Sequence, residues 1–171
     1  DIATEGALFA YVLRSPVAHA DITNLDVADA SEAPGVHMVI TGTSLEADGV
    51  RNQMDAALIK NRDGSYGAAP LRRILTTDRV RFVGEPLAVV IADTLEQAKD
   101  AVELIEFDYE DLPVSLAVNP GAGPDIHPEA PGNLAYDWAK GDEEATAKAF
   151  AAAAHTTKLY VGDNRIIANS M

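Results

Sequence analysis

Residues 78–113, DRVRFVGEPLAVVIADTLEQAKDAVELIEFDYEDLP, constrain the fold more than any other part of the chain. Within this stretch, residues 87–92 form an unbroken apolar run that is rich in Val and Ile. A β-branched run of this length predicts a strand with both faces covered rather than a helix. We therefore expect residues 87–92 to lie at the centre of a sheet.

The residues before this run predict another strand and a turn. Residues 79–82 alternate between polar and apolar side chains, which is typical of a half-buried strand. Gly84-Glu85-Pro86 follows, and proline has no backbone N–H to donate to a strand ladder. The three residues therefore indicate a turn or bulge.

The residues after the run predict a helix followed by a strand. Thr94 and Gln97 have the spacing of a capping box, in which each side chain bonds to the other residue's backbone N–H. Apolar residues then recur at helical spacing up to Ile105, and Phe107 and Tyr109 alternate with acidic residues as in a strand. Residues 78–113 thus predict a strand-turn-strand-helix-strand core.

The residues before position 78 add further strands and one long loop. Alternating patterns predict strands at 7–14, 20–27 and 36–40, with one or two helical turns at 26–33. Ser44 is a candidate cap for a short helical turn that ends at Ala47. Residues 48–71 are rich in Gly and Asn and predict a long loop with a strand at 56–60. The fold class that follows is α+β with a mixed sheet.

The composition changes after Pro113, and this change divides the whole chain into three parts. We expect a domain at 1–118, a Pro- and Gly-rich linker at 119–141, and a helix and strand at 142–171. The predicted helix begins with the acidic residues 142–144, which favour a helix N-terminus, and the predicted strand covers 156–168. Because the chain lacks an initiator Met and its last residues are apolar, we expect it to be a piece of a longer protein.

Charge and composition exclude several classes of function. The formal net charge of −14 would repel nucleic-acid backbones and anionic membranes. The chain has no cysteine, so it has neither a thiolate nucleophile nor cysteine ligands for an iron-sulfur cluster. It also has no apolar run of the length that spans a bilayer. We expect a cytoplasmic protein that binds no nucleic acid and has no membrane span.

The histidines and carboxylates give no clear metal site. The four histidines are scattered, without the paired spacing that zinc sites show. Acidic residues at 106–111 could bind a hard cation, but strand alternation alone produces such a face, and we expect it to be solvated. We therefore assign no metal ligand.

Glu85, Ser15 and His19 are the candidates for catalysis, and each has a simpler explanation. Glu85 lies on a constrained turn, where a carboxylate can serve as an acid or a base. The favoured interpretation is that Gly and Pro form the turn while Glu85 points to water. Ser15 and His19 are close in sequence but lack a nucleophile-elbow pattern and a third member. No glycine run matches a phosphate-binding loop. We assign no catalytic or cofactor-binding residue.

Several segments together resemble a known family. They are LRSPVAHADI at 13–22, APGVHMVITG at 33–42, VRFVGEPLAVVIADTLEQAKDAVELIEFDYEDLP at 80–113, and NRIIANSM at 164–171. In this order they resemble the α/β-hammerhead region of molybdenum hydroxylase large subunits, the family of aldehyde oxidase, xanthine dehydrogenase and aerobic carbon monoxide dehydrogenase. The resemblance assigns residues 1–118 to the hammerhead domain.

The resemblance implies a function for the parent protein rather than for this chain alone. Such enzymes hydroxylate aldehydes or heterocycles, or oxidise carbon monoxide, at a molybdopterin that is often the cytosine dinucleotide form. The resemblance places iron-sulfur clusters and FAD on partner subunits and the molybdopterin-binding domain after this chain. The fragment is then scaffold and interface, with no cofactor of its own.

Two alternatives belong to other classes of function. The first is a free-standing binding or interaction domain with the hammerhead fold. The second is a hydrolase that uses Glu85, or Ser15 with His19. If the chain is a fragment, apolar surface left uncovered by the remaining domains is expected to favour self-association.

Overall fold

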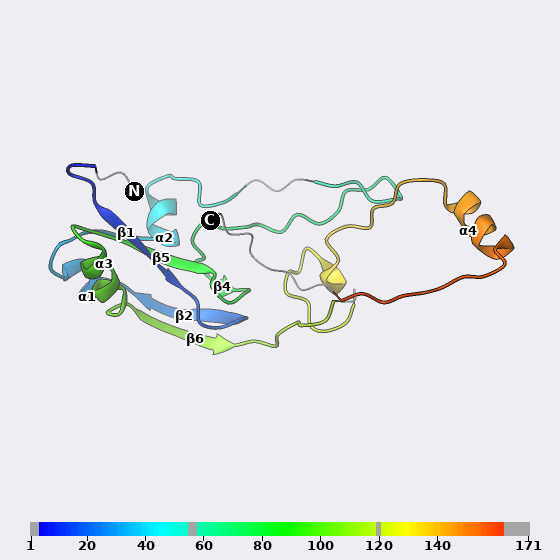
Figure 1. The fold of residues 1–171 in the computed structure, drawn as a ribbon. Helices are drawn as coiled ribbons and strands as arrows, with labels where there is room; N and C mark the ends of the chain where they lie inside the picture. Colours follow the sequence, from blue (N-terminus) through cyan, green and yellow to red (C-terminus); the bar gives the residue numbers. More distant parts are fainter. Residues whose placement is uncertain (1–3, 55–57, 119–120, 163–171) are drawn as a thin grey trace. The chain divides into compact units, whose positions relative to one another are not determined.

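The computed structural model describes residues 4–54, 58–118 and 121–162, and Figure 1 shows its fold. The chain divides into two units, Asp1–Trp138 and Ala139–Met171. The first unit holds all of the strands that the structure describes.

The first sheet has the strand order β1-β5-β3, with β1 at Phe9–Arg14, β5 at Pro86–Ala92 and β3 at Val36–Thr41. Both neighbours pair with β5 in antiparallel fashion. Four of the seven residues of β5 are buried. The prediction that the apolar run forms a central strand is confirmed, because β5 has a strand on each side and one of its faces, with Ala88, Val90 and Ala92, is fully buried.

The second sheet has the order β4-β2-β6, with β4 at Arg79–Val80, β2 at Ala20–Asp26 and β6 at Glu106–Asp111. Its pairs are also antiparallel. The α+β class is therefore confirmed, but the strands form two antiparallel sheets instead of the one mixed sheet that we expected.

A corner between the two sheets explains this difference. The β1–β2 connection and the β4–β5 turn meet there, since Ser15 N–H donates to Glu85 O at 2.9 Å and Gly84 N–H donates to Ser15 O at 2.8 Å. Pro16 and Pro86 lie beside these bonds and cannot donate to a continuing ladder. Both chain segments consequently pass from one sheet to the other at this corner.

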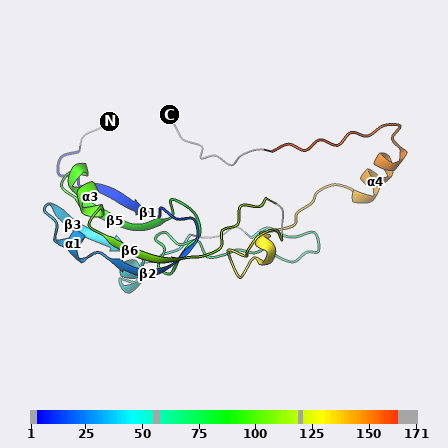
Figure 2. The same cartoon turned by 90° about the horizontal axis from the view of Figure 1, so that it is seen from below.

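Helices α1 (Ala28–Glu32) and α3 (Leu95–Val102) lie together against the β1-β5-β3 sheet, as Figures 1 and 2 show. Small side chains dominate the contact, which lets the helices approach the sheet closely. The buried core residues are Ala30, Ala88, Val90, Ala92, Ala98, Ala101, Val102 and Ile105. This core holds β5 and α3 in place, and with them the turn that precedes β5.

Capping boxes begin two of the helices. Gln97 N–H donates to Thr94 Oγ1 at 3.2 Å and Thr94 N–H donates to Gln97 Oε1 at 3.0 Å, so the capping box predicted for α3 is confirmed. Helix α2 (Gly42–Ala47) begins in the same way, but its cap is Thr41 and Ser44 is the third helical residue. The prediction of Ser44 as the cap is therefore wrong. Thr41 ends β3 in the extended conformation that a cap residue needs.

The long loop between α2 and β4 has ordered backbone contacts in its described part. Isolated bridges join Met54 to Arg72 and Lys60 to Tyr66, so the loop doubles back like a hairpin. Of the strand predicted at 56–60, residues 56 and 57 lie outside the described residues. Linker residues 134–138, which follow a short 3₁₀ helix at Pro131–Asn133, run beside the hairpin through a 2.7 Å bond from Ala68 N–H to Ala135 O. The hairpin and linker form one layer.

The second unit contains helix α4 at Glu143–Ala152. Asp142 caps it, accepting from Ala145 N–H at 2.8 Å, so the helix predicted after 142 is confirmed. None of its residues is buried. Residues 156–162 form no strand with any other described part of the chain, so the strand predicted there is not formed in this part. Residues 163–168 of that prediction lie outside the described residues.

Candidate functional site: the polar network around Glu85

Glu85 lies in the turn between β4 and β5, and its side chain points into the protein. Only 8% of the residue is exposed, and its carboxylate accepts a 2.6 Å hydrogen bond from Arg81 N–H. Burial raises the pKa of this carboxyl, while the Arg81 N–H and the Arg81 charge act in the opposite direction. The predicted turn is confirmed, but the expectation that Glu85 points to water is wrong. Gly84, with φ of +87°, folds the turn back so that the carboxylate reaches Arg81.

Ser15 and His19 are both buried, but they do not form the pair that a hydrolase needs. Ser15 Oγ donates to Val17 O at 2.9 Å and accepts from Val17 N–H at 3.1 Å. His19 Nδ1 lies 2.7 Å from Pro113 O and must carry its proton there, because a carbonyl only accepts. Ser15 therefore stabilises a local turn, and His19 holds the end of β6 against β2.

Two buried nitrogen atoms near this turn have no hydrogen-bond partner among the described residues. They are Nε2 of His19 and Nε of Arg81. Because Ala20 pairs with Val80, the next position of the register places Arg81 opposite His19. Burial lowers the pKa of the His127 imidazole in the linker, and the nearby charge of Arg81 lowers it further. The linker therefore passes close to this polar end of the sheet.

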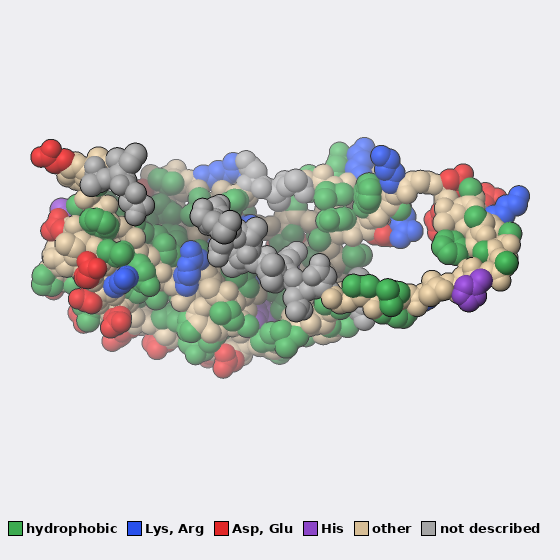
Figure 3. All heavy atoms as spheres, in the orientation of Figure 1, with side chains coloured by type: hydrophobic (Ala, Val, Ile, Leu, Met, Phe, Trp, Pro, Cys, Tyr) green, Lys and Arg blue, Asp and Glu red, His purple; other side chains and the backbone are tan. Residues whose placement is uncertain are grey.

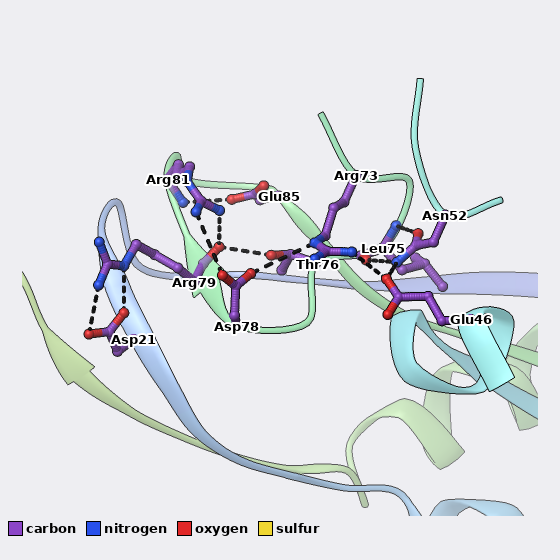
Figure 4. Close-up of polar contacts among 10 residues, drawn as sticks. All are labelled: Asp21, Glu46, Asn52, Arg73, Leu75, Thr76, Asp78, Arg79, Arg81 and Glu85. Atoms are coloured by element: carbon purple, nitrogen blue, oxygen red, sulfur yellow. Dashed lines mark hydrogen bonds and ion pairs between the residues drawn. The ribbon is translucent and has the colours of Figure 1, made fainter. Parts of the chain in front are cut away.

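A chain of ion pairs extends from this turn to helix α2, as Figure 4 shows. Asp78 lies between Arg81 and Arg73, with nitrogen–oxygen distances of 3.8 Å to each. Arg73 pairs in turn with Glu46 of α2. The contacts with Asp78 are long and the carboxylate is exposed, so each contributes little alone. Together they orient residues 73–81.

Asn52 connects the two ends of the long loop. Its Nδ2 donates to Leu75 O at 2.8 Å and its Oδ1 accepts from Leu75 N–H at 2.9 Å. Both residues are buried, and Nδ2 also donates to Glu46 at 3.1 Å. The sequence marked Asn52 only as a loop residue, because its partner lies 23 positions away.

Asp21 and Arg79 form a two-pronged ion pair across β2 and β4. Arg79 Nε and Nη2 donate to the two carboxylate oxygen atoms at 2.5 and 3.0 Å. The guanidinium lowers the pKa of the Asp21 carboxyl, and the carboxylate raises the pKa of Arg79. This pair holds the short strand β4 onto its neighbour.

A groove of about 430 Å³ lies between the hairpin and the linker. Arg62 closes part of it by donating from Nε and Nη2 to Asp137 Oδ1 at 3.0 and 2.9 Å. Tyr66, Leu134 and Tyr136 supply apolar lining. Basic and acidic side chains both line the groove, so neither sign of charge dominates it.

The acidic residues of β6 are all exposed, as expected for a solvated face. In the ranges that the structure describes, no three His, Cys, Asp or Glu side chains are grouped so that they could hold a metal ion. No helix in those ranges is long and apolar enough to cross a membrane.

The polar residues of this site therefore hold segments of the chain together. The side chains of Glu85, Ser15 and His19 each bond to the backbone, and the pairs Asp21–Arg79 and Asn52–Leu75 fix β4 and the loop. These contacts set the positions of β4 and the long loop on the surface of the domain. None of these contacts joins a nucleophile to a base.

Comparison with known proteins gives the class of the fold and then the family. Residues 1–113 match the family described as "Aldehyde oxidase and xanthine dehydrogenase, a/b hammerhead domain". The two antiparallel sheets with helices against one of them are thus an α/β-hammerhead domain. The chain belongs to the aldehyde oxidase and xanthine dehydrogenase family, whose members are molybdenum hydroxylases.

Two relatives show how far the similarity extends. The nicotine 6-hydroxylase large subunit of Paenarthrobacter nicotinovorans is 37% identical over 136 residues, which cover 78% of this chain and 16% of the relative. The carbon monoxide dehydrogenase large chain of Afipia carboxidovorans is 31% identical over 173 residues, which cover 92% of this chain and 20% of the relative. The chain therefore spans about a fifth or less of the length of these relatives.

A solved structure of a Cu,Mo-CO dehydrogenase superposes with a TM-score of 0.72 at 28% identity. The match covers 90% of this chain and 20% of the other. Quinoline 2-oxidoreductase from Pseudomonas putida 86 superposes with a TM-score of 0.59 at 36% identity, over 66% of this chain and 14% of the other. Both similarities are to part of a much longer polypeptide.

Proposed function

We propose that this chain is the N-terminal part of the molybdopterin-binding large subunit of a molybdenum hydroxylase. The observation that carries the proposal is the combination of a hammerhead match over 1–113 with coverage of only 16–20% of the large-subunit relatives. On this proposal the parent enzyme hydroxylates an aldehyde or a heterocycle, or oxidises carbon monoxide. The chain supplies scaffold and interface and has no active site of its own.

The residues described here do not fit a molybdopterin site. The buried polar side chains bond to nearby backbone, and the groove beside the linker is open and lined by opposed charges. On our proposal the molybdopterin, in its cytosine dinucleotide form, is held by later domains of the large subunit. Iron-sulfur clusters and FAD belong to partner subunits, in keeping with relatives named as a large or gamma subunit.

The size of the native polypeptide tests this proposal. An antibody against the purified chain is used on lysates of cells that express the gene from its own locus. We expect one band with about five times the length of this chain, in proportion to the 20% coverage of the carbon monoxide dehydrogenase large chain. A band at the mass expected for a polypeptide of 171 residues would instead favour a free-standing binding domain.

A further inference from the structure

The long loop has a charge opposite to that of the rest of the protein. We call residues 50–75 the loop arm. It contains five basic residues and two acidic ones, whereas the rest of the chain contains eight basic and 25 acidic residues. The loop arm therefore has a formal net charge of +3, and the rest of the chain has a formal net charge of −17. In Figure 3 acidic side chains gather around β2, β6 and α3, and basic side chains lie over the loop arm.

The loop arm also exposes large apolar side chains. Each of six such residues is 44–60% exposed: Val50, Met54, Leu58, Tyr66, Leu71 and Ile74. The adjoining linker residues Leu134, Tyr136 and Trp138 are 42–59% exposed. Aromatic residues and Arg are enriched in protein interfaces, and a cluster of exposed apolar side chains marks an interaction surface. The combination suits a protein partner with an acidic rim.

Hydrogen bonds hold the described parts of the loop arm, residues 50–54 and 58–75, in place. Asn52 clamps its two ends through Leu75, and Gly67 N–H donates to Ile59 O at 2.8 Å inside the hairpin. At Gly67 a Cβ would lie 2.5 Å from Ala135 O, so only glycine lets the linker approach this closely. A preformed surface loses less conformational entropy on binding than a flexible loop does.

We propose that the loop arm docks on an acidic, apolar-centred surface of a later domain of the same large subunit. This inference rests on the proposed function. Nucleic acid and anionic membrane are disfavoured as partners because the −17 charge of the remaining residues would repel both.

Continuity of the chain favours a later domain over a separate protein. Trp138 belongs to the surface beside the loop arm and is the last residue of the first unit. The polypeptide that follows the hammerhead therefore leaves from the docking surface itself. A tethered domain is present there at high effective concentration, so a moderate intrinsic affinity is enough to keep it docked.

Photo-crosslinking in the full-length large subunit tests the inference. Benzoylphenylalanine replaces Tyr136 beside the loop arm, and in a control it replaces Tyr109 on the acidic strand β6. We expect position 136 to crosslink to an acidic segment of the same subunit beyond residue 171, and position 109 not to do so. A crosslink from 136 only to another subunit, to nucleic acid or to lipid, or no crosslink, would overturn the inference.

Charge reversal supplies the second readout. Lys60→Glu with Arg72→Glu changes two exposed residues of the loop arm, and Lys140→Glu with Lys148→Glu makes the same charge change in the second unit. We expect the crosslink from 136 to fall at least about five-fold in the first variant and to stay unchanged in the second, because charge steers such contacts. Equal yields in both variants would contradict the inference. Absence of any longer polypeptide would reject the proposed function as well, whereas a full-length subunit without the crosslink rejects this inference alone.

Discussion

Asn52 and Leu75 face each other across the ends of the long loop, and the Asn52 amide bonds to both backbone groups of Leu75. The Asn52 side-chain amide thus makes the two hydrogen bonds that a neighbouring strand would otherwise make with the backbone of Leu75. Because both residues are buried, neither Leu75 group can turn to water instead. The Asn52 side chain therefore holds the two ends of the loop arm together.

Replacing Asn52 should therefore destabilise the fold. In Asn52→Leu the N–H and C=O of Leu75 lose their partner while they remain buried, so we expect the free energy of unfolding to fall by about 2 to 4 kcal/mol. Urea unfolding monitored by circular dichroism measures the change. Asn24→Leu is the control, since Asn24 is exposed and makes only a 3.4 Å bond to Asp108. Equal losses in the two variants would show that the Asn52 clamp is unimportant.

The capping box of α3 gives a smaller and more local effect. Thr94→Ala removes the acceptor for Gln97 N–H, and the free energy of unfolding should fall by about 1 kcal/mol. Thr156→Ala, at an exposed position outside any helix, is the matched control and should change stability little. A Thr94 variant as stable as the Thr156 variant in the same urea titration would contradict this assignment.

Glu85 should make stability depend on pH. Its pKa is raised above the ordinary value of 4.5 in the folded state, so folding favours the protonated carboxyl. The folded chain then binds more protons than the unfolded chain between the two pKa values, and stability falls as pH rises through that window. Glu85→Gln removes this dependence. We expect the variant to gain stability relative to the wild type as the pH rises above 4.5, the ordinary pKa of the carboxyl.

Unfolding of the two proteins at several pH values checks this expectation, and Glu106→Gln on the exposed strand β6 controls for the loss of a carboxylate. A stability difference that stays constant with pH, or that changes in the opposite direction, would show that Glu85 is not held in the buried position described here.

Gly67 should control how the linker lies against the loop arm. A Cβ at this position would meet Ala135 O and Tyr136, so Gly67→Ala should separate the two segments without unfolding the sheets. The amide of Ala68, which donates to Ala135 O, should then exchange its hydrogen about ten-fold faster or more. Gly162→Ala is the control, because no other part of the described chain lies within 4 Å of its Cβ position. Unchanged exchange at Ala68 would refute the close contact.

The sequence predicted those features that depend on neighbours in the chain. The Thr94–Gln97 capping box needs residues three positions apart, and the central position of β5 follows from its own apolar run. The hammerhead resemblance likewise rested on continuous segments, and the family match over 1–113 confirms it.

The features that sequence reasoning missed depend on distant segments. The Asn52 clamp joins residues 23 positions apart, and the Glu85 carboxylate turns inward because Gly84 folds the turn toward Arg81. The division into two sheets arises where residues 15 and 85 meet, 70 positions apart. Hydrophobic periodicity describes one strand at a time and carries no information about which strands share a sheet.

The molybdenum content of the purified 171-residue chain tests most directly the claim that this domain is a scaffold for an active site elsewhere. The chain is produced in cells that make molybdopterin, and bound metal is measured by mass spectrometry alongside dye-coupled oxidation of an aldehyde, a heterocycle and carbon monoxide. We predict far less than one molybdenum atom per chain and no turnover, with metal and activity appearing only in the full-length subunit with its partners. One molybdenum atom per chain together with substrate oxidation by the chain alone would contradict the account.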